Sequence, residues 1–261
     1  ATFNSMTEHI RRLIESQREL TRAVSHELRT PVARIRFAVD MLADTDDYED
    51  RMSQRDYIDQ DIESLNGLID EILTYAKLEE GSPKMDWEDV DLQELVSQIA
   101  RETNALGKPV TVKVGNVQKG VFAQADRRYL HRVLQNLAGN ATRYAESTII
   151  ISAGLEKNEA FISVEDDGQG IAEKDREKVF IPFARLDDSR TSASGGYGLG
   201  LSIVSRIAFW FNGRMSVDES PTLGGARFIM KWPKSQLASS IEADEITQKS
   251  SEKKYTQAQG S

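Results

Sequence analysis

The helical character of the N-terminal third constrains this chain more than any other feature of its sequence. Residues 1–81 contain one proline and two glycines. Apolar residues recur there at alternating steps of three and four, in two heptad seams separated by the acidic stretch 44–50. The first seam contains Phe3, Met6, Ile10, Leu13, Leu20 and Val24, with Gln17 as its polar member, and the second contains Ile58, Ile62, Leu65, Ile69, Ile72 and Ala76.

The two seams predict a helical hairpin with an acidic connection. A lone hairpin covers each apolar stripe only once. The pattern therefore favours a symmetric dimer in which two hairpins complete a four-helix bundle.

The composition changes at residues 81–83, where Gly-Ser-Pro marks a break. Beyond it, β-branched segments alternate with helical ones, which predicts an α/β sandwich with helices on a mixed sheet. The expected strands are 110–114, 148–153, 160–165, 215–218 and 227–232, and the expected helices are 92–104, 126–145 and 199–211. The fold class expected is thus α plus α/β.

From Ser235 onward the chain is rich in Ser, Gln, Lys and Glu and poor in large apolar residues. This composition predicts a disordered tail over 235–261 that can be deleted without loss of activity or melting temperature. The alternative is a C-terminal helix docked on the body.

Charge and cysteine usage exclude several functions. The chain has 42 acidic residues against 33 Lys plus Arg, a net charge of -9, which argues against nucleic acid as a partner. The absence of cysteine excludes disulfides, thiolate catalysis and cysteine-ligated zinc. No apolar stretch of the sequence approaches the roughly 20 residues of a spanning helix, so we expect the chain as given to be soluble.

The motif SHELRTP lies in the first helical segment. At about 100° per residue, His26 points away from the apolar seam and faces water. A neutral imidazole there offers a nucleophilic nitrogen, with Glu27 beside it to orient or deprotonate the ring and Thr30 one turn later on the same face. Pro31 is expected to bend the helix. The alternative is that His26 is an ordinary surface histidine.

The motif NLAGNATRYA places Asn136, Asn140, Arg143 and Tyr144 along one stripe of a helix. Two asparagines one turn apart weaken a helix, but their amide oxygens can hold magnesium together with nucleotide phosphates. Alternatively, the two amides bond each other or the backbone.

Acids and glycines follow an apolar strand in the motif VEDDGQGI. A buried carboxylate at that strand end, Asp166, can accept the exocyclic amine of a purine, while Gly168 and Gly170 let the backbone approach the base. The alternative is a tight loop after a strand. We expect the later pair Gly224 and Gly225 to form no more than a turn.

The motif GGYGLGLSIV leads from Gly196, Gly198 and Gly200 into an apolar helix. Glycine-rich backbone at a helix N-terminus can cradle phosphate. The motif is not a P-loop, because no Gly-Lys-Ser/Thr follows it. The stretch before it reads as a mobile lid that carries Arg185 and Arg190 toward phosphates.

Six motifs, SHELRTP, NLAGNATRYA, DDGQG, VFIPFARLD, GGYGLGLSIV and LGGARF, occur in this order. In order and spacing they resemble the H, N, G1, F, G2 and G3 boxes of the sensor histidine kinases of two-component systems. The resemblance covers residues 3–233, and residues 3–20 look like the exit of a HAMP relay helix. Within the family, the chain is similar to the envelope-sensing kinases.

The resemblance implies an ATP- and Mg²⁺-dependent protein histidine kinase. It implies a homodimer that phosphorylates itself and passes the phosphoryl group to an aspartate of a response regulator. The chain would be the cytoplasmic portion of a bacterial inner-membrane sensor that meets the membrane only through a missing N-terminal region. The four implied parts are a HAMP-exit helix at 1–20, a dimerisation and phosphotransfer hairpin at 21–80, a Bergerat-type ATP-binding domain at 88–234 and the tail at 235–261.

The resemblance also implies roles for matching residues. His26 would be the phosphoacceptor, Glu27 its acid/base partner, and Thr30 the residue that positions water for dephosphorylating the regulator. Asn136 and Asn140 would be the metal ligands. The implied ATP site contains Asn136, Asn140, Arg143, Tyr144, Asp166, Gly168, Gly170, Arg185, Arg190, Gly196, Gly198, Gly200 and Leu201.

One segment of the chain departs from the family pattern. Many relatives have a His-Gly pair after the G2 helix, where residues 209–213 here read FWFNG, although Gly213 still suits a helix cap.

Two other functions are alternatives to a histidine kinase. A related ATPase or protein-serine kinase would share the ATP pocket, but it would not carry SHELRTP on a dimerising hairpin. A nonenzymatic scaffold is disfavoured by the intact His26, Asn140 and Asp166.

Overall fold

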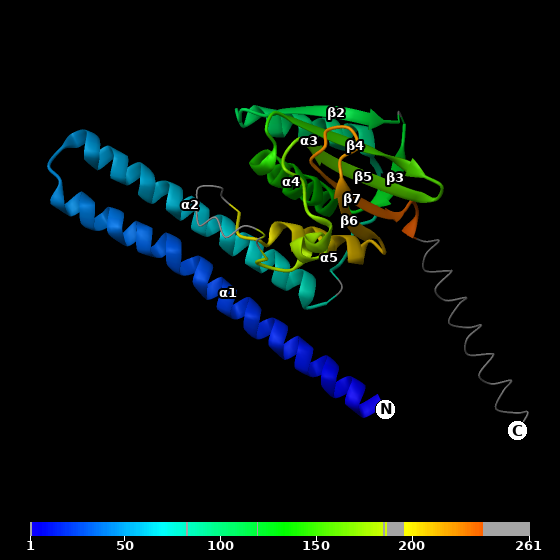
Figure 1. Cartoon of the computed structure of the whole chain (residues 1–261), viewed down its shortest axis with the longest axis horizontal. Coiled ribbons are helices and arrows are strands. Elements are labelled where there is room, and N and C mark those ends of the chain that lie inside the picture. Colours follow the sequence, from blue (N-terminus) through cyan, green and yellow to red (C-terminus); the bar gives the residue numbers. More distant parts are fainter. Residues whose placement is uncertain (1, 82, 119, 185, 187–195, 237–261) are drawn as a thin grey trace, which may run out of the picture. The chain divides into compact units, whose positions relative to one another are not determined.

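The computed structural model describes residues 2–81, 83–118, 120–184, 186 and 196–236, with side chains in the first helix given for Arg18 and from Thr21 onward. The chain divides into two compact units (Figure 1). The first contains Ala1–Glu80 and Ile181–Ser202, and the second contains Gly81–Phe180 and Ile203–Ser261. None of the described helices is both long and apolar enough to cross a membrane.

Two long helices, α1 (Thr2–Asp44) and α2 (Tyr48–Glu79), lie side by side in the first unit and confirm the predicted hairpin (Figure 1). The connection is shorter than the acidic stretch, because Asp47 caps α2 by accepting hydrogen bonds from the N–H groups of Glu49 (2.9 Å) and Asp50 (3.1 Å). Helix α1 continues through Pro31 without interruption. The bend expected at Pro31 stays a prediction.

The hairpin has one packed face and one open face. Ala38, Leu68 and Leu78 are buried, and the guanidinium of Arg34 binds the carboxylate of Asp61 on the facing helix (Nε–Oδ2, 3.1 Å). The second heptad seam is only partly covered, since Ile62 and Ile69 are 43% and 40% exposed. Val32, Val39 and Leu73 are exposed as well.

A five-stranded sheet organises the second unit, with strand order β2-β4-β5-β7-β6. Strands β2 and β4 are parallel and the other pairs are antiparallel. The mixed sheet expected from the sequence is confirmed, with strands a few residues longer than predicted. Their bounds are β2 Thr111–Val117, β4 Thr148–Glu156, β5 Glu159–Asp166, β6 Arg214–Glu219 and β7 Ala226–Pro233.

A second, two-stranded sheet pairs β1 (Glu88–Asp91) with β3 (Phe122–Ala125). The sequence analysis missed both strands, because each has only four residues and β1 is mostly acidic. Its last residue, Asp91, also caps the next helix by accepting from Gln93 N and Glu94 N. The small sheet therefore sets where that helix begins.

Helices α3 (Leu92–Ala105) and α4 (Arg127–Tyr144) cover one face of the large sheet, α3 over β2 and β4 and α4 over β4 and β5. Helix α5 (Gly200–Trp210) buries Ile203 and Ile207. Two single-turn 3₁₀ helices, η1 (Glu173–Asp175) and η2 (Lys178–Phe180), follow β5. The α/β sandwich predicted from the sequence is confirmed.

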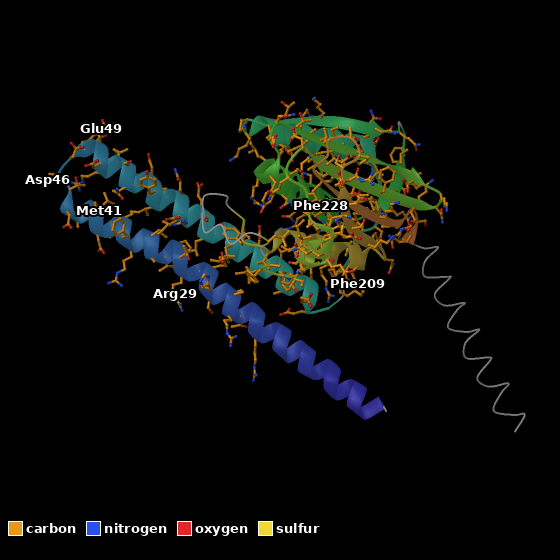
Figure 2. All side chains as sticks on the ribbon, viewed as in Figure 1. Arg29, Met41, Asp46, Glu49, Phe209 and Phe228 are labelled. Atoms are coloured by element: carbon orange, nitrogen blue, oxygen red, sulfur yellow. The ribbon has the colours of Figure 1, made fainter. Side chains whose placement is uncertain are left out.

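The end of α5 differs in detail from the expectation. Asn212, with φ of +52°, is the left-handed residue of the helix cap, and Gly213 donates from its N–H to the carbonyl of Ala208 (2.8 Å). Gly213 is required for another reason, since a Cβ there would lie 2.2 Å from the carbonyl oxygen of Lys231. Phe209, in the departing FWFNG segment, is 58% exposed, whereas Phe228 lies within the packed side chains of the unit (Figure 2).

Ser235 and Gln236, the first residues of the expected tail, pack against the second unit. Gln236 is 8% exposed. Its backbone N–H donates to the side chain of Gln124 (2.8 Å), and its Nε2 donates to the carbonyl of Phe211 (3.0 Å). The remainder of the expected tail, 237–261, lies outside the described residues.

Gln236→Ala is expected to lower the melting temperature by about 2–4 °C, because it removes the two side-chain hydrogen bonds that join Gln236 to Phe211 and Asn212. All three tryptophans, Trp87, Trp210 and Trp232, belong to the second unit, so their fluorescence reports its unfolding. Gln60→Ala, at an exposed position of α2, is the control. An unchanged melting temperature for Gln236→Ala would show that the packing of Gln236 contributes nothing.

Candidate functional site

His26 lies on an open face of α1. Its side chain is 76% exposed, and its Nδ1 lies 3.6 Å from Oε1 of Glu27. Thr30 is exposed as well, one helical turn further along. The expectation that His26 faces solvent, with Glu27 beside it, is therefore confirmed.

Asp166 ends strand β5 and is buried, at 2% exposure. Its Oδ1 accepts hydrogen bonds from the N–H groups of Gly168 (3.0 Å) and Ala226 (3.2 Å). Burial raises the pKa of Asp166 above its usual range, although these two hydrogen bonds oppose the shift; the neighbouring charge of Asp167 adds to it. A buried carboxylate with a raised pKa and two donors among the described residues retains acceptor capacity, which suits a purine amine.

Glycine is required around Asp166 because three backbone segments meet there. A Cβ on Gly168 would lie 2.2 Å from the carbonyl oxygen of Tyr144, and a Cβ on Gly225 would lie 2.6 Å from Oδ1 of Asp166. Gly170 has φ of +70° and packs on Gly225. The end of α4, the loop after β5 and the turn before β7 thus converge on one carboxylate.

Asp167 ties the loop after β5 to the junction between α4 and β4. Its carboxylate accepts from the backbone N–H groups of Glu146, Ser147 and Thr148 at 2.9 to 3.1 Å, and from the hydroxyl of Ser147 at 2.6 Å. Burial alone would raise the pKa of Asp167, but these hydrogen bonds outweigh burial and lower it to about 2. Asp167 therefore holds the end of α4 beside Asp166.

Helix α4 presents the four residues predicted from NLAGNATRYA. The helix packs through Leu130, Leu134 and Leu137, all fully buried. Asn136 and Asn140 are half-buried, while Arg143 and Tyr144 are exposed. The Nδ2 of Asn136 is buried and has no hydrogen-bond partner in the described part of the chain, so the alternative that the two asparagines bond each other is not what the structure shows.

The asparagine pair fits a magnesium–nucleotide group. Amide oxygens are hard ligands of the kind that magnesium accepts alongside phosphates. The buried Nδ2 of Asn136, which has no partner in the described part of the chain, is a donor that an oxygen of a bound phosphate could satisfy.

The predicted phosphate cradle belongs to the first unit. Gly198 has φ of +76°, and a Cβ on it would lie 2.8 Å from the Cα of Phe183; its carbonyl accepts from the N–H of Phe183 (2.8 Å). Tyr197 hydrogen-bonds the hydroxyl of Ser64 (2.8 Å). Gly196, Gly200 and Leu201 are half-buried, with Gly200 opening α5 as expected. Arg185 and Arg190, the arginines of the predicted lid, lie outside the described residues.

Sequence reasoning missed three residues around Asp166. Asp167 was passed over because two adjacent acids are hard to tell apart in DDGQG, and it lies just beyond the end of β5. Gly225 was expected to form a turn only. Ala226 contributes through its backbone N–H, a group that leaves no signal in side-chain patterns.

Two family models match the chain. Residues 16–81 match the His Kinase A (phospho-acceptor) domain. Residues 125–236 match the histidine kinase-, DNA gyrase B-, and HSP90-like ATPase. The two matched ranges contain SHELRTP and the Asn136, Asp166 and Gly198 segments. The first covers the hairpin from residue 16 onward, and the second covers the sandwich from the end of β3 to β7.

Curated relatives are similar over most of this chain. The sensor protein RstB of Escherichia coli (strain K12) is 41% identical over 231 residues, which cover 88% of this chain and 52% of RstB. The sensor histidine kinase CpxA of the same strain is 31% identical over 238 residues, 89% of this chain and 50% of CpxA. The chain thus spans about half the length of these relatives.

Among solved structures, full-length ShkA in complex with AMPPNP is 26% identical, with a TM-score of 0.61 over 83% of this chain and 45% of ShkA. The family models and the curated relatives therefore agree with the family that the motifs predicted. The HAMP exit expected at 1–20 stays a prediction.

Asp167→Asn is expected to destabilise the second unit by about 1–2 kcal/mol at pH 7, because a charged acceptor of several hydrogen bonds is replaced by a neutral one. The folded-state pKa of Asp167, about 2, lies below the ordinary 3.8. Its stabilisation is thus fully present above pH 3.8 and is lost as the pH falls toward about 2.

Urea unfolding followed by tryptophan fluorescence checks this, with the exposed Asp89→Asn as control. The difference in unfolding free energy between wild type and Asp167→Asn should decrease as the pH is lowered through about 4 to about 3. A difference that stays constant over this pH range would contradict the role of the Asp167 charge.

Proposed function

Because the chain belongs to the sensor histidine kinases of two-component systems, we propose that it transfers the γ-phosphoryl group of ATP to His26 and then to an aspartate of a response regulator. The observation that carries this proposal is the open imidazole of His26, 76% exposed with Glu27 beside it, inside the matched phospho-acceptor domain. The same chain also matches an ATPase domain, which could supply the phosphoryl group to His26. An ordinary surface histidine would not require such a domain.

The neighbouring carboxylate selects the reactive nitrogen of His26. Glu27 Oε1 is on the Nδ1 side of the ring, at 3.6 Å, so it favours the tautomer with the proton on Nδ1 and leaves the lone pair on Nε2. Nε2 then attacks the γ-phosphorus while the bond to the β-phosphate oxygen breaks and ADP leaves. Glu27 accepts the Nδ1 proton as positive charge develops on the ring. Attack by the regulator's aspartate on the same phosphorus regenerates His26.

The second unit supplies the ATP site in this proposal. Asp166 accepts the exocyclic amine of adenine, and Tyr144, half exposed at the end of α4, lies along the base. Asn136 and Asn140 would hold Mg²⁺, which when bound neutralises charge on the phosphates. Gly168 and Gly170 let the backbone approach the nucleotide. The complex of the similar ShkA structure with AMPPNP, an ATP analogue, supports this choice of ligand.

The remaining predicted ATP residues complete the site in the proposal. Gly196, Gly198, Gly200 and Leu201 would contribute glycine-rich backbone for phosphate, and Arg143, Arg185 and Arg190 would add positive charge. The left-handed φ of Gly198, +76°, supports a glycine-dependent conformation there.

Thr30 favours a second activity, dephosphorylation of the phosphorylated regulator. Its hydroxyl is exposed one turn beyond His26. It can hydrogen-bond a water molecule in line with a phosphoryl-aspartate bound at this face, but it supplies no nucleophile for autophosphorylation.

We further propose that the hairpin works as a homodimer and docks the regulator. The exposed apolar residues Ile62, Ile69 and Leu73 form a face that a second hairpin would cover as a four-helix bundle. The named relatives are sensor proteins about twice as long as this chain. We therefore place these two domains on the cytoplasmic side of a bacterial inner-membrane sensor, where ATP is supplied.

Thr30→Ala is expected to keep labelling of His26 by γ-labelled ATP and to slow decay of the phosphorylated regulator by about tenfold to a hundredfold. His26→Gln must abolish the acid-labile label. Thr30→Ser, which keeps the hydroxyl, is the matched control. Equal loss of both activities in Thr30→Ala would instead assign Thr30 to the helix geometry at Pro31, and normal decay would remove its proposed role.

Asp166→Asn and Asn140→Ala are expected to fail differently. Asp166→Asn should weaken ADP binding by about tenfold or more with and without Mg²⁺, because the adenine amine loses its charged acceptor. Asn140→Ala should leave Mg²⁺-free ADP binding near that of the wild type and reduce phosphotransfer more than affinity. Calorimetry with and without Mg²⁺ separates the two, and a matching profile for both variants would contradict the division of roles.

A further inference from the structure

Two successive carboxylates at the end of β5 both hold the turn at residues 220–226. Asp166 accepts from the backbone N–H of Ala226, at the end of this turn. Glu165, which is 8% exposed, accepts from the hydroxyl of Ser220, at the start of the turn, at 2.6 Å. Since adjacent residues of a strand point to opposite faces, the turn is fastened on both faces of β5.

Ser220 has every polar group in use. It is 2% exposed. Its N–H donates to the carbonyl of Gly225 (2.7 Å), and its carbonyl accepts from Gly224 (2.9 Å). Its Oγ accepts from the N–H of Leu223 (2.9 Å). A hydroxyl has one hydrogen, and that hydrogen goes to Glu165.

The turn held by Ser220 carries one of the two donors to the Asp166 carboxylate, Ala226, and a glycine that packs on Asp166, Gly225. Gly225 packs so closely that an added Cβ would lie 2.4 Å from the backbone carbonyl oxygen of Asp166. Ala226 follows it and donates to Oδ1 of Asp166. A displacement of the turn by a few tenths of an ångström would therefore weaken this hydrogen bond and open the packing beside the carboxylate.

We propose that Glu165 and Ser220 are positioning residues for the nucleotide: through the turn 220–226 they set the orientation and charge state of Asp166, the adenine acceptor. This inference rests on the proposed ATP-binding function and deepens it. Glu165 lies on the face of β5 opposite to Asp166, and the Ser220 hydroxyl is bound to Glu165, so both would act on the nucleotide through Asp166. Glu165 belongs to VEDDGQGI, where the sequence analysis gave it no role, and Ser220 lies in none of the motifs identified in the sequence.

A positioning role for Glu165 and Ser220 changes the pH dependence of nucleotide binding, whereas a purely structural role does not. The charged group beside Asp166 is Asp167, and the donors that oppose its burial are the N–H groups of Gly168 and Ala226. On the Glu165 face, the charged neighbours are Arg227 and its partner Asp218. Loss of the Ala226 hydrogen bond raises the pKa of Asp166 further, so protonation abolishes its charge at a higher pH.

The experiment measures ADP affinity of the full chain by calorimetry from about pH 8 to about pH 4.5. Ser220→Ala and Glu165→Ala should weaken ADP binding by about fivefold to tenfold at pH 8 and move the pH midpoint of binding upward. Glu165→Gln, which keeps an oxygen acceptor for the Ser220 hydroxyl, should restore both. Ser163→Ala is the matched control, since Ser163 is buried on the same face of β5, two residues away.

The possible results distinguish a failure of the positioning role from a failure of the proposed ATP-binding function. An equal loss at every pH, or wild-type binding by Ser220→Ala while Asp166→Asn loses ADP, would overturn the positioning role. No ADP binding by the wild type, or undiminished binding by Asp166→Asn, would overturn the proposed function instead. If Ser220→Ala does not fold, the comparison of Glu165→Gln with Glu165→Ala decides, because only the restored pH midpoint in Glu165→Gln supports the proposal.

Discussion

The second unit depends on the placement of one buried carboxylate, Asp166. Burying it costs free energy unless donors compensate, and the chain supplies them from two backbone segments that are far apart in sequence, at Gly168 and Ala226. These donors can reach the carboxylate only because glycines allow the backbone to approach closely at 168 and 225. The convergence of α4, β5 and β7 on this point is thus a consequence of satisfying the charge.

The pKa of the next residue, Asp167, shifts in the direction opposite to that of Asp166. Asp167 accepts hydrogen bonds from three successive N–H groups and a hydroxyl, and its pKa falls to about 2, whereas burial raises the pKa of Asp166. Environment alone separates the two acids. One of them holds the loop to the end of α4 at all physiological pH values, and the other keeps acceptor capacity for a ligand.

In the proposed function, the hairpin and the sandwich each supply one half of the phosphotransfer chemistry. The imidazole of His26 is exposed on a helix that needs no special backbone geometry there. The proposed nucleotide site, in contrast, depends on strand ends and glycine turns. This division explains why the acceptor is visible as a short motif on one helix, while the ATP site is spread over several motifs.

The sequence predicted the periodic parts of this fold well. Heptad seams and alternating β-branched segments gave the hairpin and the sheet because burial imposes a regular spacing. The strands β1 and β3 were missed because each has only four residues, which carry too little pattern, and β1 is mostly acidic. His26, Asn136 and Asp166 could be singled out from side-chain chemistry and family resemblance.

Contacts made by the backbone escaped the sequence analysis. The left-handed residue at the cap of α5 is Asn212 and not Gly213. A glycine is required at 213 by the close approach of the Lys231 backbone and not by a left-handed φ. The N–H of Ala226 and the turn that presents it leave no trace in composition or periodicity. Gln236 was grouped with the polar tail, although hydrogen bonds to Gln124 and Phe211 fix it.

The central claim, that Asp166 is the acceptor for adenine, can be tested directly by a carboxyl-carbon NMR titration of Asp166 with and without ADP. In the free protein, burial should give Asp166 a pKa above the ordinary 3.8. ADP should lower this pKa, because a hydrogen bond from the adenine amine favours the charged form. An Asp166 pKa that does not respond to saturating ADP would contradict the account.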